Sequence, residues 1–255
     1  MPLIGERIKV SYLRKIQFHT EGAEAVLYVT DEAEIAETLR KKGEAVLIYL
    51  HSGNSGQDFS NYLFAVEDPE DLEPEYIERV YRRLKGLPWY ITNTARCRIR
   101  ETIPEDVEAF YRIYSDPSIT KYMENLYPEK EEEKQYIREY IDKIYTYYGY
   151  GIWTIVECQS DEVIGRVGFS NREGFEDPEL GFIIGTPWQR KGYAMEVCQG
   201  VLRYGWTALD FRQVQALVAP GNVPSLRVCE KLGFQYEKNV VLKEGEYCQF
   251  ILRRK

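Results

Sequence analysis

The sequence predicts an α/β protein of two domains, and three observations support this fold class. Apolar runs of strand length alternate with segments whose apolar residues recur every three to four positions, as on one face of a helix. Gly86-Leu87-Pro88, followed by Thr92-Asn93-Thr94, has the composition of a domain joint. With 255 residues, the chain is long enough for two small domains. We therefore expect a small α/β domain at residues 1–94 and a second domain, of mixed α and β structure, at 95–255.

The first domain is predicted from strands that alternate with helices. Residues 25–29, 45–50 and 62–66 are strand-like. A helix that begins after Asp31, its N-cap, separates the first two strands, and a second helix covers residues 75–84. This alternation favours a parallel, Rossmann-like sheet.

A glycine-containing turn at residues 53–56 follows a strand end, where open α/β sheets bind ligands. No Lys-Ser/Thr pair follows its glycines and no helical pattern starts directly after it, so a polar turn is favoured over a phosphate loop. The sequence therefore predicts no function for the first domain.

The composition argues against several classes of function. The net charge of −8 disfavours nucleic acid as a partner, because phosphate binding depends on Lys and Arg. No apolar run approaches the ~20 residues that a membrane span needs, and the N-terminus lacks a signal-peptide core. The five cysteines are widely spaced without a Cys-x-x-Cys pair, which disfavours disulfide frameworks and metal sites. We therefore expect a cytoplasmic protein without a bound metal ion.

An anion-binding loop is predicted where an apolar strand at residues 179–185 leads into a helix. The first amides of a helix have no internal partners, and together with the helix dipole they favour an anion. Gly192 lets a phosphate group approach the backbone, and the small Ala194 keeps the next turn open. Arg190 and Lys191 add positive charge, so the loop is suited to a pyrophosphate. The alternative to an anion-binding loop is an ordinary solvated helix start that contains one glycine and two cationic residues.

A second block of sequence, at residues 222–234, makes this interpretation more specific. In this order, the two blocks resemble the GNAT superfamily of acyl-CoA-dependent N-acetyltransferases. Gln189, Gly192 and Ala194 match the family's Gln/Arg-x-x-Gly-x-Gly/Ala loop, and the second block matches its Asn-x-x-Ser…Glu-Lys-Leu-Gly-Phe segment. The resemblance is confined to residues 95–255.

The resemblance implies a GNAT fold, a mixed, mostly antiparallel sheet flanked by helices, in which the fourth and fifth strands splay apart. The co-substrate would be acetyl-CoA, whose pyrophosphate binds the loop amides and whose pantetheine arm pairs with the preceding strand. Asn222 would bond the pantetheine arm or cap the following helix. The cofactor-binding residues implied in this way are Phe182, Ile183, Ile184, Gln189, Arg190, Lys191, Gly192, Tyr193, Ala194, Met195, Asn222 and Ser225.

The activity that the resemblance implies is acetyl transfer to a primary amine. An unperturbed lysine ammonium has a pKa of ~10.4, so a base must remove its proton before the attack. Glu179 is the candidate base because it begins the strand that leads to the loop, where several GNAT branches carry the base. The fifth strand, residues 213–218, has no carboxylate. A surface glutamate at a strand end is the alternative interpretation of Glu179.

The group that protonates the departing thiolate is left open by the sequence. Many family members carry a tyrosine seven residues after the asparagine, where this chain has Cys229. There are three options: Cys229 is the acid, Ser225 or a water is the acid, or the thiolate departs without a proton donor. A small packing residue is an equal alternative for Cys229. With a thiol at this position, the chain resembles the branch of the GNAT family that is similar to ribosomal-protein N-terminal acetyltransferases.

Two functions from different classes are consistent with these residues. The first is N-acetyl transfer by direct attack in a ternary complex, with a small-molecule, peptide or protein amine as the acceptor. The first two helices of the second domain and the loop between them would select this amine. The second is an acyl-CoA-binding sensor without turnover that regulates the first domain, suggested by Cys229 and by the lack of a fifth-strand glutamate.

Overall fold

The computed structural model describes residues 11–254, which form two compact units divided between Trp89 and Tyr90. The strand β5 (Tyr90–Asn93) pairs with β6 (Cys97–Arg100) in the sheet of the second unit, although the sequence suggests a boundary after residue 94. Within the described range, none of the helices combines the length and the hydrophobicity that crossing a membrane requires.

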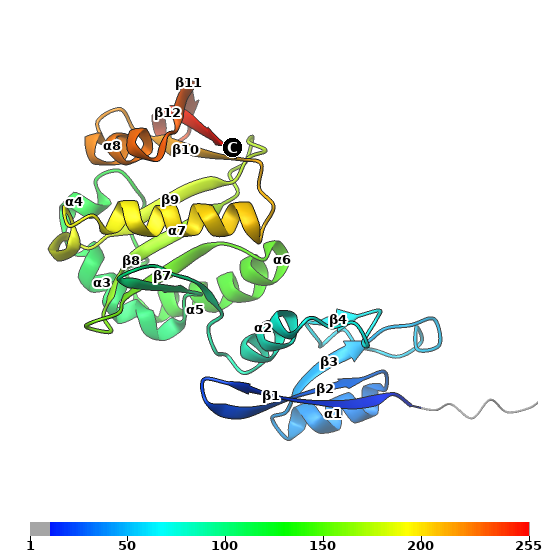
Figure 1. Cartoon of the computed structure of the whole chain (residues 1–255). Coiled ribbons are helices and arrows are strands. Elements are labelled where there is room, and N and C mark those ends of the chain that lie inside the picture. Colours follow the sequence, from blue (N-terminus) through cyan, green and yellow to red (C-terminus); the bar gives the residue numbers. More distant parts are fainter. Residues whose placement is uncertain (1–10, 255) are drawn as a thin grey trace, which may run out of the picture. The chain divides into compact units, whose positions relative to one another are not determined.

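The first unit is a small sheet with two helices (Figure 1). Its elements are β1 (Leu13–Thr20), β2 (Ala23–Thr30), α1 (Ala33–Lys41), β3 (Ala45–Tyr49), β4 (Ala65–Val66) and α2 (Pro74–Leu84). The strand order is β1-β2-β3-β4, in which β2, β3 and β4 are parallel while β1 and β2 form an antiparallel hairpin. The expected parallel arrangement thus holds for β2, β3 and β4, whereas β1 adds an antiparallel edge that was not predicted.

The two helices of the first unit pack on opposite faces of β3, because successive side chains of a strand point to opposite sides. Leu47 shares a buried cluster with Ile77 of α2. Val46 and Ile48 share another with Ala36 of α1. Each face of this sheet is thus covered by one helix.

The second unit is built on one eight-stranded sheet in the order β11-β12-β10-β9-β8-β7-β6-β5. Every neighbouring pair is antiparallel except β9 and β10, which confirms the mixed, mostly antiparallel sheet. Its remaining strands are β7 (Ile152–Glu157), β8 (Val163–Ser170), β9 (Glu179–Ile184), β10 (Gln213–Val218), β11 (Gln235–Leu242) and β12 (Gly245–Arg253). Its helices are η1 (Pro104–Asp106), α3 (Val107–Tyr114), α4 (Pro117–Thr120), α5 (Lys130–Tyr140), η2 (Ile141–Tyr145), α6 (Thr146–Tyr148), η3 (Thr186–Trp188), α7 (Tyr193–Thr207) and α8 (Val223–Leu232).

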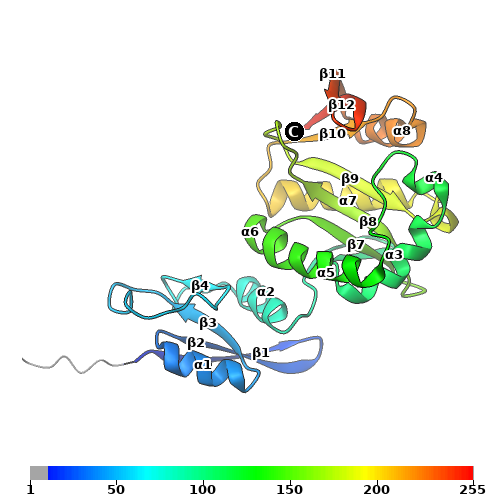
Figure 2. The same ribbon diagram turned by 180° about the vertical axis from the view of Figure 1, so that it is seen from behind.

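Helices cover both faces of this sheet. Figure 1 shows α7 across one face, and Figure 2 shows α3 and α5 across the other. The alternation along β7 follows this layering. Trp153 points to α7, where its ring lies 5.7 Å from that of Tyr204, and the hydroxyl of Thr154 donates to Asp106 of η1 at 2.8 Å.

The sheet divides between β9 and β10. These parallel strands share a single pair in register, Glu179 with Gln215, whereas β9 pairs with β8, and β10 with β12, along their whole lengths. The two strands therefore diverge after Glu179, in agreement with the splay that the resemblance implies. The edge of β9 that faces this gap has backbone groups without a strand partner.

Candidate active site

The loop between β9 and α7 adopts a sharply curved backbone. Gly192 has a φ of +87°, a left-handed conformation that glycine adopts without strain, and Arg190 is also left-handed, at +59°. The side-chain amide of Gln189 donates to the carbonyl of Ile184 at 2.9 Å and so ties the loop to the end of β9. The matched glutamine thus has a structural role in shaping the loop.

The N-terminus of α7 opens directly from this loop. The N–H of Glu196 donates to the carbonyl of Gly192 at 3.1 Å. The amides of Tyr193, Ala194 and Met195 precede this first helical hydrogen bond, so they point out of the helix end. The predicted pyrophosphate loop therefore has the geometry of an anion site at a helix N-terminus.

Arg96 supports the loop and was not predicted from the sequence. Its Nη1 donates to the carbonyl of Lys191 at 3.0 Å, and its Nε forms an ion pair of 2.7 Å with Glu196. Its guanidinium also lies over the ring of Tyr193, 4.0 Å from the centroid. A Cβ at position 192 would meet Arg96 Nη2 at 3.5 Å. No local pattern indicates this role, because Arg96 reaches the loop only through the tertiary fold.

Glu179 lies where β9 and β10 begin to diverge. It is buried, with 8% of its surface exposed, so the alternative of a surface glutamate is wrong. Nε of Arg172 donates to Oε2 of Glu179 at 2.7 Å, and the amide of Leu217 also donates to the carboxylate. Burial raises the pKa of Glu179, and these two contacts offset part of that rise.

The second sequence block forms the start of α8. Oδ1 of Asn222 accepts from the N–H of Ser225 at 3.3 Å, so Asn222 is the N-cap of this helix. Cys229 is buried within α8, and burial raises the pKa of its thiol to about 11. Because β9 and β10 are parallel, α7 and α8 both begin at the same edge of the sheet. The fold thereby brings the two sequence blocks together.

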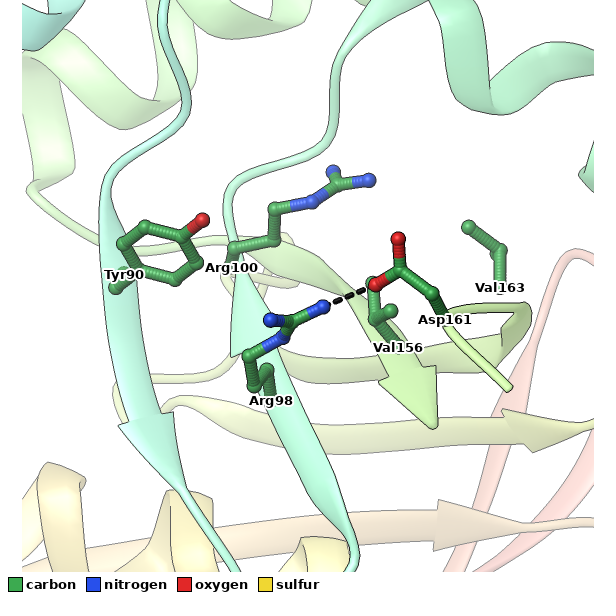
Figure 3. Close-up of a pocket in the computed structure, with 6 residues that line it drawn as sticks. All are labelled: Tyr90, Arg98, Arg100, Val156, Asp161 and Val163. Carbon is green, nitrogen blue, oxygen red and sulfur yellow. Dashed lines mark hydrogen bonds and ion pairs between the residues drawn. The ribbon is translucent and has the colours of Figure 1, made fainter. Parts of the chain in front are cut away.

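A pocket of about 200 Å³ is lined by residues of β5, β6, β7 and β8 and holds none of the predicted site residues (Figure 3). Arg98 is ion-paired with Asp161, and Arg100 binds both carboxylate oxygens of Asp106 at 2.7 Å. Both guanidinium groups therefore already have anionic partners. Its lining residues are Tyr90, Arg98, Arg100, Val156, Asp161 and Val163. No cluster of His, Cys, Asp or Glu suited to a metal ion occurs in residues 11–254.

Comparison with known proteins agrees with this architecture. The sequence model of the acetyltransferase (GNAT) domain matches residues 96–235. Uncharacterized N-acetyltransferase p20 of Bacillus licheniformis is 31% identical over 147 residues, which cover 56% of this chain and 82% of the relative. The ribosomal protein uS5-alanine N-acetyltransferase of Escherichia coli (strain K12) is 32% identical over 96 residues, 36% of this chain and 50% of the relative.

Solved structures share the fold of the second unit. Mycobacterium smegmatis RimJ in complex with CoA-disulfide has a TM-score of 0.52 at 17% identity, over 66% of this chain and 88% of RimJ. The domain match covers more than half of the 255 residues and includes the splayed strands, the Gly192 loop and the start of α8. The chain therefore belongs to the GNAT family of acetyltransferases.

Proposed function

We propose that the second unit acetylates a primary amine with acetyl-CoA, by direct attack of the amine within a ternary complex. The supporting observation is the left-handed turn at Gly192, which opens into α7 beside two diverging strands. The amides of residues 190–195 would hold the pyrophosphate. The edge of β9 that has no strand partner, at Phe182, Ile183 and Ile184, would bind the pantetheine arm. Acetyl-CoA supplies the activated acetyl thioester.

In the proposed reaction, the amine nitrogen attacks the thioester carbonyl. A C–N bond forms and the C–S bond breaks, which yields an acetamide and the free thiol of CoA. Glu179 takes the ammonium proton, directly or through a water, before the attack. Its raised pKa supports this role, because a base is most effective when its pKa approaches the working pH.

Cys229 is better suited to packing than to proton donation. Its thiol pKa of about 11 exceeds the ~8.5 of an ordinary thiol, so proton transfer to the departing thiolate is unfavourable. We expect Cys229→Ala to keep kcat/KM within about threefold of wild type and to lower stability by about 1 kcal/mol, the loss of one buried heavy atom. Steady-state kinetics and urea unfolding measure the two effects. A tenfold drop in kcat with unchanged acetyl-CoA affinity would instead make Cys229 the acid.

The ion pair between Arg172 and Glu179 allows the role of Glu179 as the base to be tested by the pH dependence of kcat/KM. Arg172→Gln removes a partner that favours ionised Glu179, so the pKa of that carboxyl should rise further. A base acts only when deprotonated, so the acidic limb of the kcat/KM profile should move to higher pH. Arg203→Gln, at an exposed position of α7, is the control for the change in net charge. If the pH profiles of kcat/KM for Arg172→Gln and wild type were superimposable, Glu179 would be ruled out as the base.

An acceptor screen tests the proposed function as a whole. The chain is incubated with acetyl-CoA and pooled amino acids, polyamines and peptides with free N-termini, while thiol release and acetylated products are followed. Peptides are included because an α-amino group, with a pKa of ~7.8, is neutralised at little cost. We expect amine-dependent thiol release. Tight acetyl-CoA binding without thiol release in the presence of any amine would contradict acetyl transfer and favour an acyl-CoA sensor.

A cytoplasmic location is also part of the proposal. None of the five cysteines forms a disulfide in the structure. Free thiols of this kind suit a reducing compartment.

A further inference from the structure

The short helix α4 belongs to a segment, residues 116–122, that is hydrogen-bonded at both of its ends to distant parts of the chain. At its start, Oδ2 of Asp116 accepts from the hydroxyl of Thr186 at 2.5 Å. At its end, the hydroxyl of Tyr122 donates to the carbonyl of Gly221 at 2.7 Å. The two contacts join residues that are 70 and 99 positions apart in the sequence, so both are made by the tertiary fold. We call residues 116–122 the α4 strap.

The two ends of the α4 strap are attached on opposite sides of the divergence between β9 and β10. Thr186 is in η3, which follows β9, and Gly221 lies between β10 and α8. Because β9 and β10 are parallel, both attachment points are at the edge of the sheet where α7 and α8 begin. Figures 1 and 2 show α4 at this edge. The α4 strap therefore connects the chain that leaves β9 with the chain that leaves β10.

The α4 strap lies on the α3 side of the sheet. Its Ile119 packs against the buried cluster of α3 and α5, against which Ile183 of β9 also packs. The helices α7 and α8, which follow the same two strands, contact each other, and α7 lies across the other face of the sheet (Figure 1). The strap is thus a second link between the diverging halves of the sheet, on the face opposite α7.

Both attachments are close contacts. A Cβ at position 221 would meet Oη of Tyr122 at 3.1 Å, which is a tight contact, so the glycine makes room for the tyrosine hydroxyl. Oδ1 of Asp116 also accepts from the N–H of Ser118 at 2.9 Å, as the N-cap of α4. The hydrogen bonds from Thr186 and Ser118 lower the pKa of the Asp116 carboxyl. Asp116 is therefore an ionised acceptor at neutral pH, and hydrogen bonds to ionised acceptors are the stronger kind.

The sheet itself does not fix the separation of β9 and β10 at this edge. The two strands share a single pair in register, at Glu179, and continue beyond it to Ile184 and Val218. Contacts outside the strand ladder must therefore set the distance between the two strand ends. A gap whose two sides are already held in place binds an extended ligand at a smaller cost in conformational entropy.

We propose that the α4 strap holds the chain on both sides of the diverging strands at the separation that the pantetheine arm of CoA fills, with Thr186 and Tyr122 as positioning residues. The arm would pair with β9 on one side and reach Asn222, the residue after Gly221, on the other. This inference rests on the proposed function, because it concerns the same cofactor site.

Release of either end of the strap would let the two sides move apart and would weaken binding of the pantetheine arm. The phosphate groups would keep their contacts, because Gln189 and Arg96 hold the Gly192 loop independently of the strap. The strap therefore predicts a loss of affinity that is confined to ligands with the arm.

Variants of nearly unchanged shape release one end of the strap each, since Tyr122→Phe and Thr186→Val remove a single hydroxyl. Calorimetry on the full chain compares the binding of CoA with that of the nucleotide part of CoA, which retains the phosphates and lacks the pantetheine arm. We expect each variant to raise the Kd of CoA roughly three- to tenfold, the effect of one lost hydrogen bond. The Kd of the nucleotide part should stay within about twofold of the wild-type value.

The double variant tests the strap as a unit. A strap that is released at one end no longer holds the two sides together, so release of the second end should raise the Kd of CoA little further. Gly221→Ala, whose added Cβ would displace the Tyr122 hydroxyl, should behave like Tyr122→Phe. Tyr236→Phe is the matched control, because it removes an exposed tyrosine hydroxyl that is hydrogen-bonded to Asn239 on β11, and it should bind CoA as wild type does.

Three results would overturn this inference: an unchanged Kd of CoA in both single variants, an equal loss for CoA and its nucleotide part, or losses that multiply in the double variant. Thermal unfolding at the wild-type temperature shows that the variants are folded. CoA carries no acetyl group, so the measurement does not need turnover. Failure of acetyl transfer in the amine screen would therefore count against the proposed function alone.

Discussion

Replacing Gly192 by glutamate is expected to raise the Kd of acetyl-CoA by roughly a hundredfold. Glycine holds a left-handed φ of +87° here, which a residue with a Cβ adopts only with strain. The new carboxylate would also lie beside the pyrophosphate, where like charges ~4 Å apart cost ~1–4 kcal/mol. Isothermal titration of acetyl-CoA measures the effect, and thermal unfolding reports whether the variant is folded.

Gly22→Glu is the matched control for this variant. Gly22 lies in the turn of the β1–β2 hairpin in the first unit, with a φ of +79° and no atom within 4 Å of an added Cβ. It carries the same backbone strain and the same added charge at a position outside the proposed site. We expect unchanged affinity in Gly22→Glu. Equal affinities in both variants would mean that the Gly192 loop does not bind the pyrophosphate.

Glu179→Gln is expected to lower kcat/KM about 100-fold to 10,000-fold, the range of general-base catalysis. This corresponds to roughly 3–5 kcal/mol of transition-state stabilisation. Glutamine keeps the size of the side chain and an acceptor for the Leu217 amide, but it cannot take a proton. The deficit should shrink at high pH, where solvent has already deprotonated the amine.

The control for Glu179→Gln is Glu176→Gln, the same change at an exposed position of the loop before β9. We expect wild-type kinetics from it, and wild-type acetyl-CoA affinity from both variants. Activity of Glu179→Gln within threefold of wild type across the pH range would place the base elsewhere.

Much of the second unit could be predicted because its signals are local. The strand that ends at Ile184, the glycine turn and the helix from Tyr193 follow from composition and spacing within one short stretch. Asn222 and Ser225 likewise form a cap within a single turn. Short-range backbone preferences decide such features, so they are visible without knowledge of the rest of the chain.

The edge strand of the first unit shows where local signals are weak. β1 places Ile16 and Phe18 against the core cluster while Lys15 and Gln17 are exposed. This period-two alternation is the signal that could have identified the strand. Its charged and polar residues hide the pattern, as is common in edge strands.

By itself, the sequence determined the family, the glycine turn between β9 and α7 and the order of strands and helices around it, because these depend on residues close together in the chain. Only the tertiary structure decided that Arg96 supports the loop and that Arg172 contacts a buried Glu179. These properties arise when strands and helices distant in sequence pack together and exclude water. Burial and charge compensation, which set the chemistry of the site, are therefore properties of the folded unit.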